Sequence, residues 1–330
     1  MARPKQRASI RDVAARAGVS HQTVSRVLNQ PELVRPDTAA RVQQAIDDLG
    51  FRPSKAARSL ATHDSMVIGV ISVQAGLFGP SHTTLAIDEG ARRRGYATAT
   101  VTVRDDSPAN LGEAREHLLG LGVDGVVLIA WSEPVLALAL RFASELPTCA
   151  VAEGDVPEGL ARVRGDHRGG AAQAVRALRE SGRRCIAHLA GPGDWLEARA
   201  RRQGWADEAG ALAGPVIETG WEPEGGLWGV DEVLAKAPGV DAIFAANDHL
   251  AAGALRRLTE LGKRVPDDIA LVGYDDVELA PYLRVPLASV RQPFAEVGSA
   301  AIDLLFELMA GAAPGSRTLP SQFVWRESAG

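Results

Sequence analysis

This 330-residue chain has little cysteine and no long apolar run. Its two cysteines, Cys149 and Cys185, are too few for a disulfide framework or a cysteine-ligated zinc site, which indicates a reducing compartment. No apolar run approaches the ~20 residues that a membrane helix needs. The basic start MARPKQRASIRD also differs from a secretory signal, which has an apolar core. We therefore expect a cytoplasmic protein that contacts no membrane.

The common catalytic motifs are also missing from the sequence. It contains no P-loop, no H-E-x-x-H, no G-x-S-x-G, no C-x-x-C and no dinucleotide-binding G-x-G-x-x-G after a predicted strand. The seven histidines lie in different segments, and we expect none to pair with a cysteine or with a serine–aspartate set. We expect no enzymatic activity, no cofactor and no bound metal.

Charge is distributed unevenly along the chain. Residues 1–63 carry a net charge of +6, whereas the remainder carries −11, which together give the overall −5. A basic N-terminal segment attached to an acidic body is typical of a module that binds a polyanion and is joined to a part with another function.

Helix signals near the N-terminus predict three short amphipathic helices. Ser9 and Asp12 have capping-box spacing, which starts a helix at the next residue after Ser9. Gly18 ends that helix, and Ser20 is a good N-cap for a second one. A third helix opens near Pro36. Two helices joined by a tight glycine turn, followed by a third, predict a helix-turn-helix domain, with a plain helical bundle as the alternative.

The exposed face of the predicted second helix has the chemistry of a DNA reader. Gln22, Ser25 and Arg26 share this face, and Gln and Arg can make paired hydrogen bonds to adenine and guanine edges in the major groove. Short polar side chains at or near helix ends can hold phosphates. We assign DNA-backbone contacts to five of these: Ser9, Ser20, Thr23, Asn29 and Thr38.

The segment SIRDVAARAGVSHQTVSRVLN, residues 9–29, resembles the opening motif of the LacI/GalR family of transcription factors. This resemblance implies that His21, Gln22 and Arg26 read bases in the operator, with Ser25 assisting. It further implies that the chain binds double-stranded DNA with a pseudo-palindromic sequence as a homodimer.

The segment FRPSKAARSLAT, residues 51–62, follows the same family pattern. By resemblance it is a hinge helix that folds when two copies meet on DNA, with Ala57 and Leu60 at the minor groove. The alternative is a plain linker. The expected division is therefore a DNA-binding domain over 1–53 and a hinge over 54–65.

Beyond residue 65, short apolar runs alternate with amphipathic segments such as 109–122, 167–182, 225–237 and 248–262. This order predicts an α/β fold of parallel sheets with helices on both faces. The predicted strands are 67–73, 97–103, 125–130, 148–152, 185–190, 215–219, 241–246 and 269–273.

The length of this part favours two lobes. By resemblance, residues 66–330 form a two-lobed, type I periplasmic-binding-protein-like effector domain with doubly wound parallel sheets. One lobe is expected to comprise about 66–164 plus 293–320, and the other about 165–291 plus 321–330.

Aromatic and planar polar side chains follow the predicted strands. In open α/β sheets ligands bind past the carboxyl ends of strands, and flat rings combined with bidentate polar groups suit sugars. Asp248 and Asp276 also follow strands, and we expect them to cap helices instead. The candidates after strands are Gln74, Trp131, Glu153, Trp221, Asn247, Tyr274 and Asp275, with Arg199 in the helix after the fifth strand.

Three further segments resemble effector-domain motifs of the same family: LAGPGDWLEARARRQGW, FAANDHLAAGALRRL and DIALVGYDDVELAPYL. Glu153 and Trp195 depart from the lac-type pattern, which has a shorter aspartate and a small serine at these positions, so the pocket should differ in shape. The effector-binding residues expected from position and resemblance are Gln74, Glu153, Trp195, Arg199, Trp221, Asn247, Asp275, Gln292 and Phe294.

These observations predict a ligand-responsive, sequence-specific repressor of sugar-utilisation genes that a small sugar releases from its operator. The alternative is a corepressor-dependent regulator that senses a nucleobase or another small metabolite. A periplasmic sugar-binding protein would share the two-lobed body, but the DNA-reading N-terminus argues against it.

Overall fold

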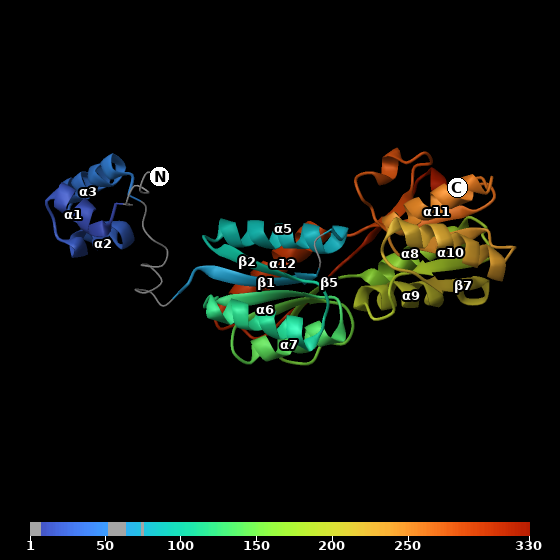
Figure 1. Ribbon diagram of the computed structural model, residues 1–330, viewed down its shortest axis with the longest axis horizontal. Helices are drawn as coiled ribbons and strands as arrows, with labels where there is room; N and C mark the ends of the chain where they lie inside the picture. The colour runs from blue at the N-terminus through green and yellow to red at the C-terminus, as the bar shows by residue number, and fades with distance from the viewer. Residues whose placement is uncertain (1–7, 52–63, 74–75) are drawn as a thin grey trace, which may run out of the picture. The chain divides into compact units, whose positions relative to one another are not determined.

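The computed structural model describes residues 8–51, 64–73 and 76–330. The chain divides between Met66 and Val67 into a small N-terminal unit and a large effector unit (Figure 1). Most of the predicted hinge, including Ala57 and Leu60, lies outside the described residues, as does Gln74.

The described part of the N-terminal unit contains three α-helices and one short 3₁₀ helix. These are α1 (Ile10–Ala17), α2 (His21–Asn29), η1 (Pro31–Leu33) and α3 (Pro36–Leu49). One face of each α-helix turns inward. The shared core consists of Val13, Ala14, Ala17, Val24, Val42, Ala45 and Ile46.

Local signals fix where these helices begin and end. The Ser9 and Asp12 side chains form a capping box at the start of α1. Gly18 follows α1 with φ 67°, a left-handed conformation that glycine adopts without steric cost. The Ser20 hydroxyl accepts a hydrogen bond from the amide of Thr23 and so caps α2. The predicted helix-turn-helix geometry is confirmed.

The effector unit contains two six-stranded sheets. In the first, the strand order is β11-β5-β4-β3-β1-β2 and all pairs are parallel. Its strands are β1 (Val67–Val73), β2 (Ala97–Val103), β3 (Gly125–Ala130), β4 (Thr148–Ala152), β5 (Ala161–Gly165) and β11 (Ser316–Leu319).

In the second sheet the order is β12-β10-β9-β8-β6-β7, and among the described strands β12 alone runs antiparallel to its neighbour. Its strands are β6 (Ile186–Ala190), β7 (Ala213–Glu218), β8 (Ala242–Ala245), β9 (Ala270–Asp275), β10 (Ala288–Arg291) and β12 (Gln322–Val324).

Helices cover both faces of each sheet, which confirms the predicted doubly wound α/β architecture (Figure 1). On the first sheet, α5 and α12 pack on one face and α6 and α7 on the other. On the second, α8 and α9 oppose α10 and α11. The bounds are α5 (Phe78–Arg93), α6 (Pro108–Gly120), α7 (Glu133–Ala143), α8 (His167–Glu180), α9 (Leu196–Ala209), α10 (Pro223–Lys236), α11 (Asp248–Glu260) and α12 (Phe294–Met309), with short 3₁₀ helices η2 (Gly210–Leu212), η3 (Ala280–Tyr282) and η4 (Glu327–Ala329).

Three segments carry the chain between the two sheets. They connect β5 to α8, β10 to α12, and β11 to β12. Nearly every residue of the central strands of both sheets is buried, so each lobe has its own apolar core on both faces of its sheet. The two lobes are thus joined at short crossovers, beside the carboxyl ends of their strands.

All eight predicted strands are present, although Tyr274 and Asp275 belong to the end of β9 rather than following it. The sequence pattern did not predict β5, β10, β11 and β12. None of the described helices is both long and apolar enough to cross a lipid bilayer.

Candidate functional site

The exposed face of α2 presents the residues predicted to read bases. His21, Gln22 and Arg26 are exposed and Ser25 is half-buried, whereas Val24 is fully buried in the core of the N-terminal unit. The helix is held by its apolar face, and its polar face is free of the core. This arrangement is what a recognition helix in the major groove requires.

Two of the side chains predicted to contact the DNA backbone take part in capping. The Ser9 hydroxyl donates to the Asp12 carboxylate, and Ser20 Oγ lies 3.0 Å from Thr23 Oγ1. Thr38 is half-buried in the first turn of α3, and the side chain of Asn29 lies outside the described residues. Their contacts with phosphate remain predictions.

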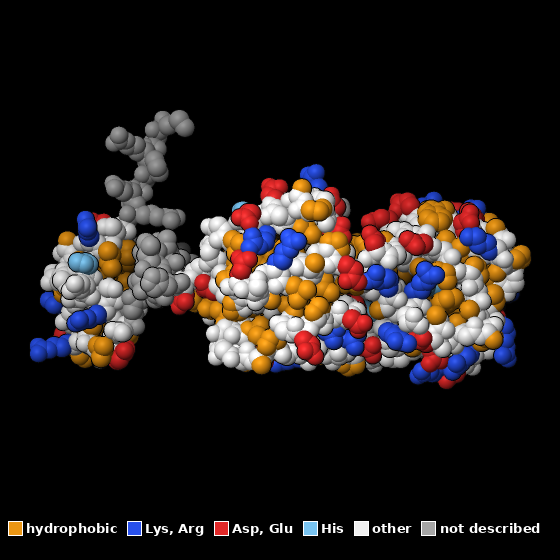
Figure 2. Space-filling view, turned by 90° about the horizontal axis from the view of Figure 1, so that it is seen from below, with side chains coloured by type: hydrophobic (Ala, Val, Ile, Leu, Met, Phe, Trp, Pro, Cys, Tyr) orange, Lys and Arg blue, Asp and Glu red, His pale blue; other side chains and the backbone are white. Residues whose placement is uncertain are grey.

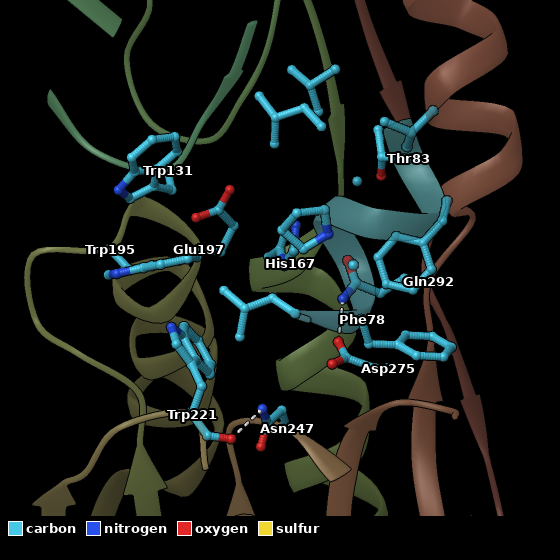
Figure 3. Close-up of a pocket in the computed structure, with 18 of the residues that line it drawn as sticks. Phe78, Thr83, Trp131, His167, Trp195, Glu197, Trp221, Asn247, Asp275 and Gln292 are labelled. Atoms are coloured by element: carbon cyan, nitrogen blue, oxygen red, sulfur yellow. Dashed lines mark hydrogen bonds between the residues drawn. The ribbon is translucent and has the colours of Figure 1, made fainter. Parts of the chain in front are cut away.

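A cavity lies between the two lobes of the effector unit (Figure 3). Its empty space amounts to about 740 Å³, a figure that includes open solvent. Two of the three crossover segments contribute lining residues. The lining includes Leu77, Phe78, Pro80, Thr83, Ile129, Trp131, Gly165, His167, Trp195, Glu197, Arg201, Trp221, Asn247, His249, Asp275, Gln292 and Phe294.

Arg201, from α9, is the central cation of this cavity. Its Nη2 lies 3.5 Å from Asp275 Oδ1, and its Nε donates to His167 Nδ1 at 3.2 Å. Its Nη1 donates to the carbonyl of Ala246. The guanidinium carbon lies 4.0 Å from the centroid of the Tyr274 ring, a cation–π distance. These contacts satisfy a buried charge and fix its position.

Asp275, at the end of β9, faces Arg201. Gln292 Nε2 donates to Asp275 Oδ1 at 2.6 Å. Burial raises the pKa of Asp275, and the charge of Arg201 and the Gln292 hydrogen bond oppose that rise. The φ of Asp275 is 108°, in a region that favours glycine. Non-glycine residues held there tend to cluster at ligand sites.

Asn247 lines the cavity and also caps α11. Its Oδ1 accepts from the amide of Leu250, and its Nδ2 donates to the carbonyl of Trp221 at 3.0 Å (Figure 3). The prediction that Asp248 is the cap was therefore wrong by one residue. Asp248 instead accepts bonds from the amide of Val277 and the hydroxyl of Ser289, since it lies one position inside the helix.

Asp276 is not a helix cap either. The backbone that follows β9 does not enter an α-helix there, so the carboxylate has no helix N-terminus to cap. It pairs instead with Arg291 at 2.7 Å and with Arg326 at 2.6 Å.

Tryptophans form one wall of the cavity (Figure 3). The ring centroids of Trp131 and Trp195 are 6.1 Å apart, and those of Trp195 and Trp221 are 5.3 Å apart at 70°. Phe78 and Phe294 pack edge to face at 5.6 Å and contribute further aromatic lining. Aromatic faces of this kind stack on the C–H faces of sugars or on planar rings.

Glu197 brings an acid to the tryptophan side of the cavity (Figure 3). Its Oε2 is buried and has no hydrogen-bond partner within the described part of the chain. Burial raises the pKa of Glu197 to about 7, with a smaller contribution from the negative charge of Glu153. A buried carboxyl oxygen without a partner costs free energy that a ligand hydroxyl could recover.

Glu153 was predicted to bind the effector, but it is not among the lining residues. Its side chain is buried, and Oε2 lies 3.2 Å from Nη1 of Arg164. Burial raises the pKa of Glu153, an effect that Arg164 opposes. Glu153 therefore acts on the cavity through the charge that it adds near Glu197.

Arg199 does not line the cavity, which corrects its predicted position. Its side chain points away and pairs with Glu133 of α7 at 2.6 Å, so that it bridges the two lobes at the surface. Residues two apart on a helix face nearly opposite directions. Arg201 therefore occupies the inward position that was assigned to Arg199.

The structure brings together six of the nine predicted effector residues: Trp195, Trp221, Asn247, Asp275, Gln292 and Phe294. Sequence reasoning missed Phe78, Glu197 and Arg201 and dismissed His167. A usable signal existed for α9, because Arg201 shares a helical stripe with Ala198 and Trp205, which are both buried.

The surface of the effector unit carries charged side chains of both signs. On the face shown in Figure 2, Lys and Arg side chains of the effector unit are intermixed with Asp and Glu, without a continuous basic field. A surface of mixed sign does not attract a polyanion strongly. This face therefore gives no sign of a DNA-binding surface on the effector unit.

Two family models match the chain. One, described as bacterial regulatory proteins of the lacI family, matches residues 9–54, and the other, a periplasmic binding protein-like domain, matches residues 175–329. Among relatives, the HTH-type transcriptional regulator CelR of Thermobifida fusca is 34% identical over 98% of this chain and 99% of its own. The HTH-type transcriptional repressor PurR of Haemophilus influenzae is 33% identical over 91% of this chain and 90% of its own.

Solved structures agree with these relationships. The lac repressor dimer bound to operator and the anti-inducer ONPF superposes with a TM-score of 0.90 at 30% identity, over 98% of this chain and 99% of the other. The CelR–cellobiose complex superposes with a TM-score of 0.73 at 31% identity, over 98% of this chain and all of the other.

Proposed function

Because the chain belongs to the LacI family of bacterial regulatory proteins, we propose that it represses sugar-utilisation genes and is released from its operator by a small sugar. The observation that carries this proposal is the presence of two binding surfaces in one chain. One is the exposed polar face of α2, and the other is the aromatic and polar cavity between the lobes.

The DNA-reading part of the proposal assigns base contacts to His21, Gln22, Ser25 and Arg26. His21, Gln22 and Arg26 are exposed, and the last two lie on the helix face opposite the buried Val24. Paired hydrogen bonds from Gln and Arg would supply sequence selectivity. Backbone contacts are assigned to Ser9, Ser20, Thr23, Asn29 and Thr38, and minor-groove contacts to Ala57 and Leu60.

The proposed assembly is a homodimer in the cytoplasm that binds a pseudo-palindromic operator. The lac repressor, its structural relative, was solved as a dimer bound to operator. Two recognition helices one helical turn apart would read the two half-sites. The proposal involves no catalysis, because the relatives CelR and PurR are transcriptional regulators.

A sugar suits the cavity for a chemical reason. Arg201, Asn247 and Asp275 offer planar, bidentate hydrogen-bonding groups, and Trp195 and Trp221 offer flat apolar faces. A pyranose has both vicinal hydroxyls and a C–H face. The relative CelR was solved as a complex with cellobiose, which supports the same ligand class here.

Effector and operator would be coupled through the arrangement of the lobes. The cavity is lined by both lobes and by the crossovers between them, so a bound ligand favours one lobe arrangement over another. A coupling of ~1–3 kcal/mol changes operator affinity about 5- to 150-fold. Gln74 and Glu153 belong to the proposed effector site, the latter through its charge.

A second candidate is a regulator that needs a nucleobase or other planar metabolite as corepressor. The observation that favours it is the wall of tryptophans, because a planar base can stack on these rings while Asp275 and Asn247 bond its edge.

Differential scanning fluorimetry of the full chain against sugars and nucleobases tests the choice between these ligands. A melting-temperature rise with a sugar but with no nucleobase is expected. A rise with nucleobases alone would overturn the sugar proposal. Selection of a binding sequence from random duplex DNA tests the proposed operator binding. Failure to enrich a palindromic sequence would overturn it.

A further inference from the structure

A second hollow, the outer groove, adjoins the cavity between the lobes. It is built from residues that follow β1 and β2 in the first lobe and β6 and β7 in the second. The charged part of its lining comprises Arg104, Asp105, Asp106, Asp194 and Glu222. Like the inner cavity, it therefore lies at the carboxyl ends of parallel strands, where α/β folds bind ligands.

The two hollows share one wall. Leu77, Trp131, Trp195 and Trp221 line both the inner cavity and the outer groove. Polar groups such as Arg201 line only the inner cavity, and the charged rim lines only the outer groove. Along the cleft, a polar region is therefore followed by an aromatic region and then by a second polar region.

The loop that carries Trp195 is fixed to both lobes. The amide of Leu196 donates to the carbonyl of Trp131 in the first lobe at 2.8 Å, and the amide of Trp195 donates to Pro192 in the second at 3.1 Å. Gly193 donates to the Glu218 carboxylate at 3.0 Å. These bonds hold the shared wall in place in this structure, so both hollows are shaped before any ligand is present.

The charged rim of the outer groove includes the residues that precede α6. Hydrogen bonds from the side chain and the amide of Ser107 and from Asn110 Nδ2 hold the pKa of Asp105 below its usual value. That aspartate organises the start of α6. Together with its neighbours Arg104 and Asp106 it also lines the outer groove.

We propose that the outer groove is a second sugar subsite and that the effector is an oligosaccharide of at least two units. One unit lies at Arg201 and Asp275, and the next lies past Trp195 against the rim around Arg104. Each unit of such a ligand offers hydroxyls to polar groups and a C–H face to a tryptophan, which matches the alternation along the cleft. This inference rests on the proposed sugar-binding function.

Isothermal titration calorimetry of the full chain with matched saccharides tests the inference. The pairs are glucose with cellobiose, glucose with maltose, and galactose with lactose. In at least one pair the disaccharide should bind at least tenfold more tightly than its constituent monosaccharide. Arg104→Ala should weaken the binding of that disaccharide about tenfold and leave monosaccharide binding unchanged.

Two variants accompany this test. Glu222→Gln changes the part of the rim that the second lobe contributes. It should also weaken disaccharide binding and leave monosaccharide binding unchanged. Arg141→Ala, at an exposed position of α7 outside both hollows, should change neither affinity. Melting curves without ligand report whether each variant folds.

The outcomes separate the inference from the function on which it rests. Monosaccharides that bind as tightly as every disaccharide would overturn the second subsite and leave sugar binding intact. So would a disaccharide that is unaffected by both rim variants. If no saccharide in any pair binds, the sugar function and the second subsite are both overturned.

Discussion

Arg201 Nη2 and Asp275 Oδ1 lie 3.5 Å apart in the effector cavity, with only 6% and 8% of the two side chains exposed. They come from α9 and β9, two elements of the same lobe. A buried ion pair is sensitive to the loss of either partner, because the remaining charge is then buried alone. The pair therefore serves both the packing of this lobe and the proposed recognition of ligand hydroxyls.

The substitution Asp275→Asn tests the ligand side of this pair. It keeps the shape and one acceptor oxygen but removes the charge that a sugar hydroxyl would bond. We expect the melting-temperature rise caused by the effector to disappear. Asp267→Asn, at an exposed surface position, is the matched control and should keep the full rise. A rise retained in Asp275→Asn would move the binding site elsewhere.

Arg199→Ala and Arg201→Ala form a matched pair on one helix. Arg201→Ala should lower the free energy of unfolding by about 3–5 kcal/mol, because it leaves Asp275 buried without its partner, and should abolish effector binding. Arg199→Ala removes a pair that is about half exposed and should cost at most about 1 kcal/mol. Urea unfolding and calorimetry measure both effects. Equal losses in the two variants would contradict the assignment of Arg201.

Arg199 and Arg201 also show which feature of the site could not be predicted from the sequence. The helix, its place after the fifth predicted strand and the cleft at the strand ends could all be predicted from residue patterns. Which of several nearby arginines faces the cleft depends on the phase of the helix, and a shift of two positions reverses the answer. The buried Trp205, four residues after Arg201, fixes that phase.

Glu197→Gln should change how stability depends on pH. The unfolded chain releases the proton of this carboxyl near its ordinary pKa of 4.5, whereas in the folded protein the pKa is about 7. Between these values the folded state holds more protons than the unfolded state, so the free energy of unfolding falls as pH rises. By pH 8 the loss due to Glu197 reaches at most about 3 kcal/mol.

The side chain of the Glu197→Gln variant cannot ionise, so the variant does not lose this stability as the pH rises. Relative to the parent, it should therefore be more stable at pH 8 than at pH 5, when unfolding is followed by circular dichroism at both values. A difference between variant and parent that is the same at both pH values would show that Glu197 ionises normally.

Arg26→Ala tests the recognition helix. Removing one bidentate contact should cost ~1–3 kcal/mol with the selected operator and relax the preference at one base pair, while weak, salt-sensitive binding to other DNA persists. Arg41→Ala, at an exposed position of α3 in the same unit, should leave base preference unchanged. Competition gel shifts with single-base variants of the operator make the comparison. An unchanged preference in Arg26→Ala would rule out base reading by this residue.

The strands show a similar limit of sequence reasoning. Eight strands could be predicted from the sequence, and the central ones among them, such as β3 and β8, are buried, continuous apolar runs. The missed β5 reads ARVRG, and its arginines alternate with small apolar residues. Two others, β11 and β12, are short and contain no buried residue, so no apolar run marks them. Their positions depend on the crossovers between lobes, which are set by tertiary packing rather than by local pattern.

The central claim is that a ligand in the cavity between the lobes controls the affinity of the DNA-reading helices. Fluorescence anisotropy of the selected operator, measured with the full chain with and without a saturating sugar that raises its melting temperature, tests it most directly. We predict a 5- to 150-fold change in operator affinity, present in the parent and absent in Asp275→Asn. The same affinity with and without bound sugar would contradict the account.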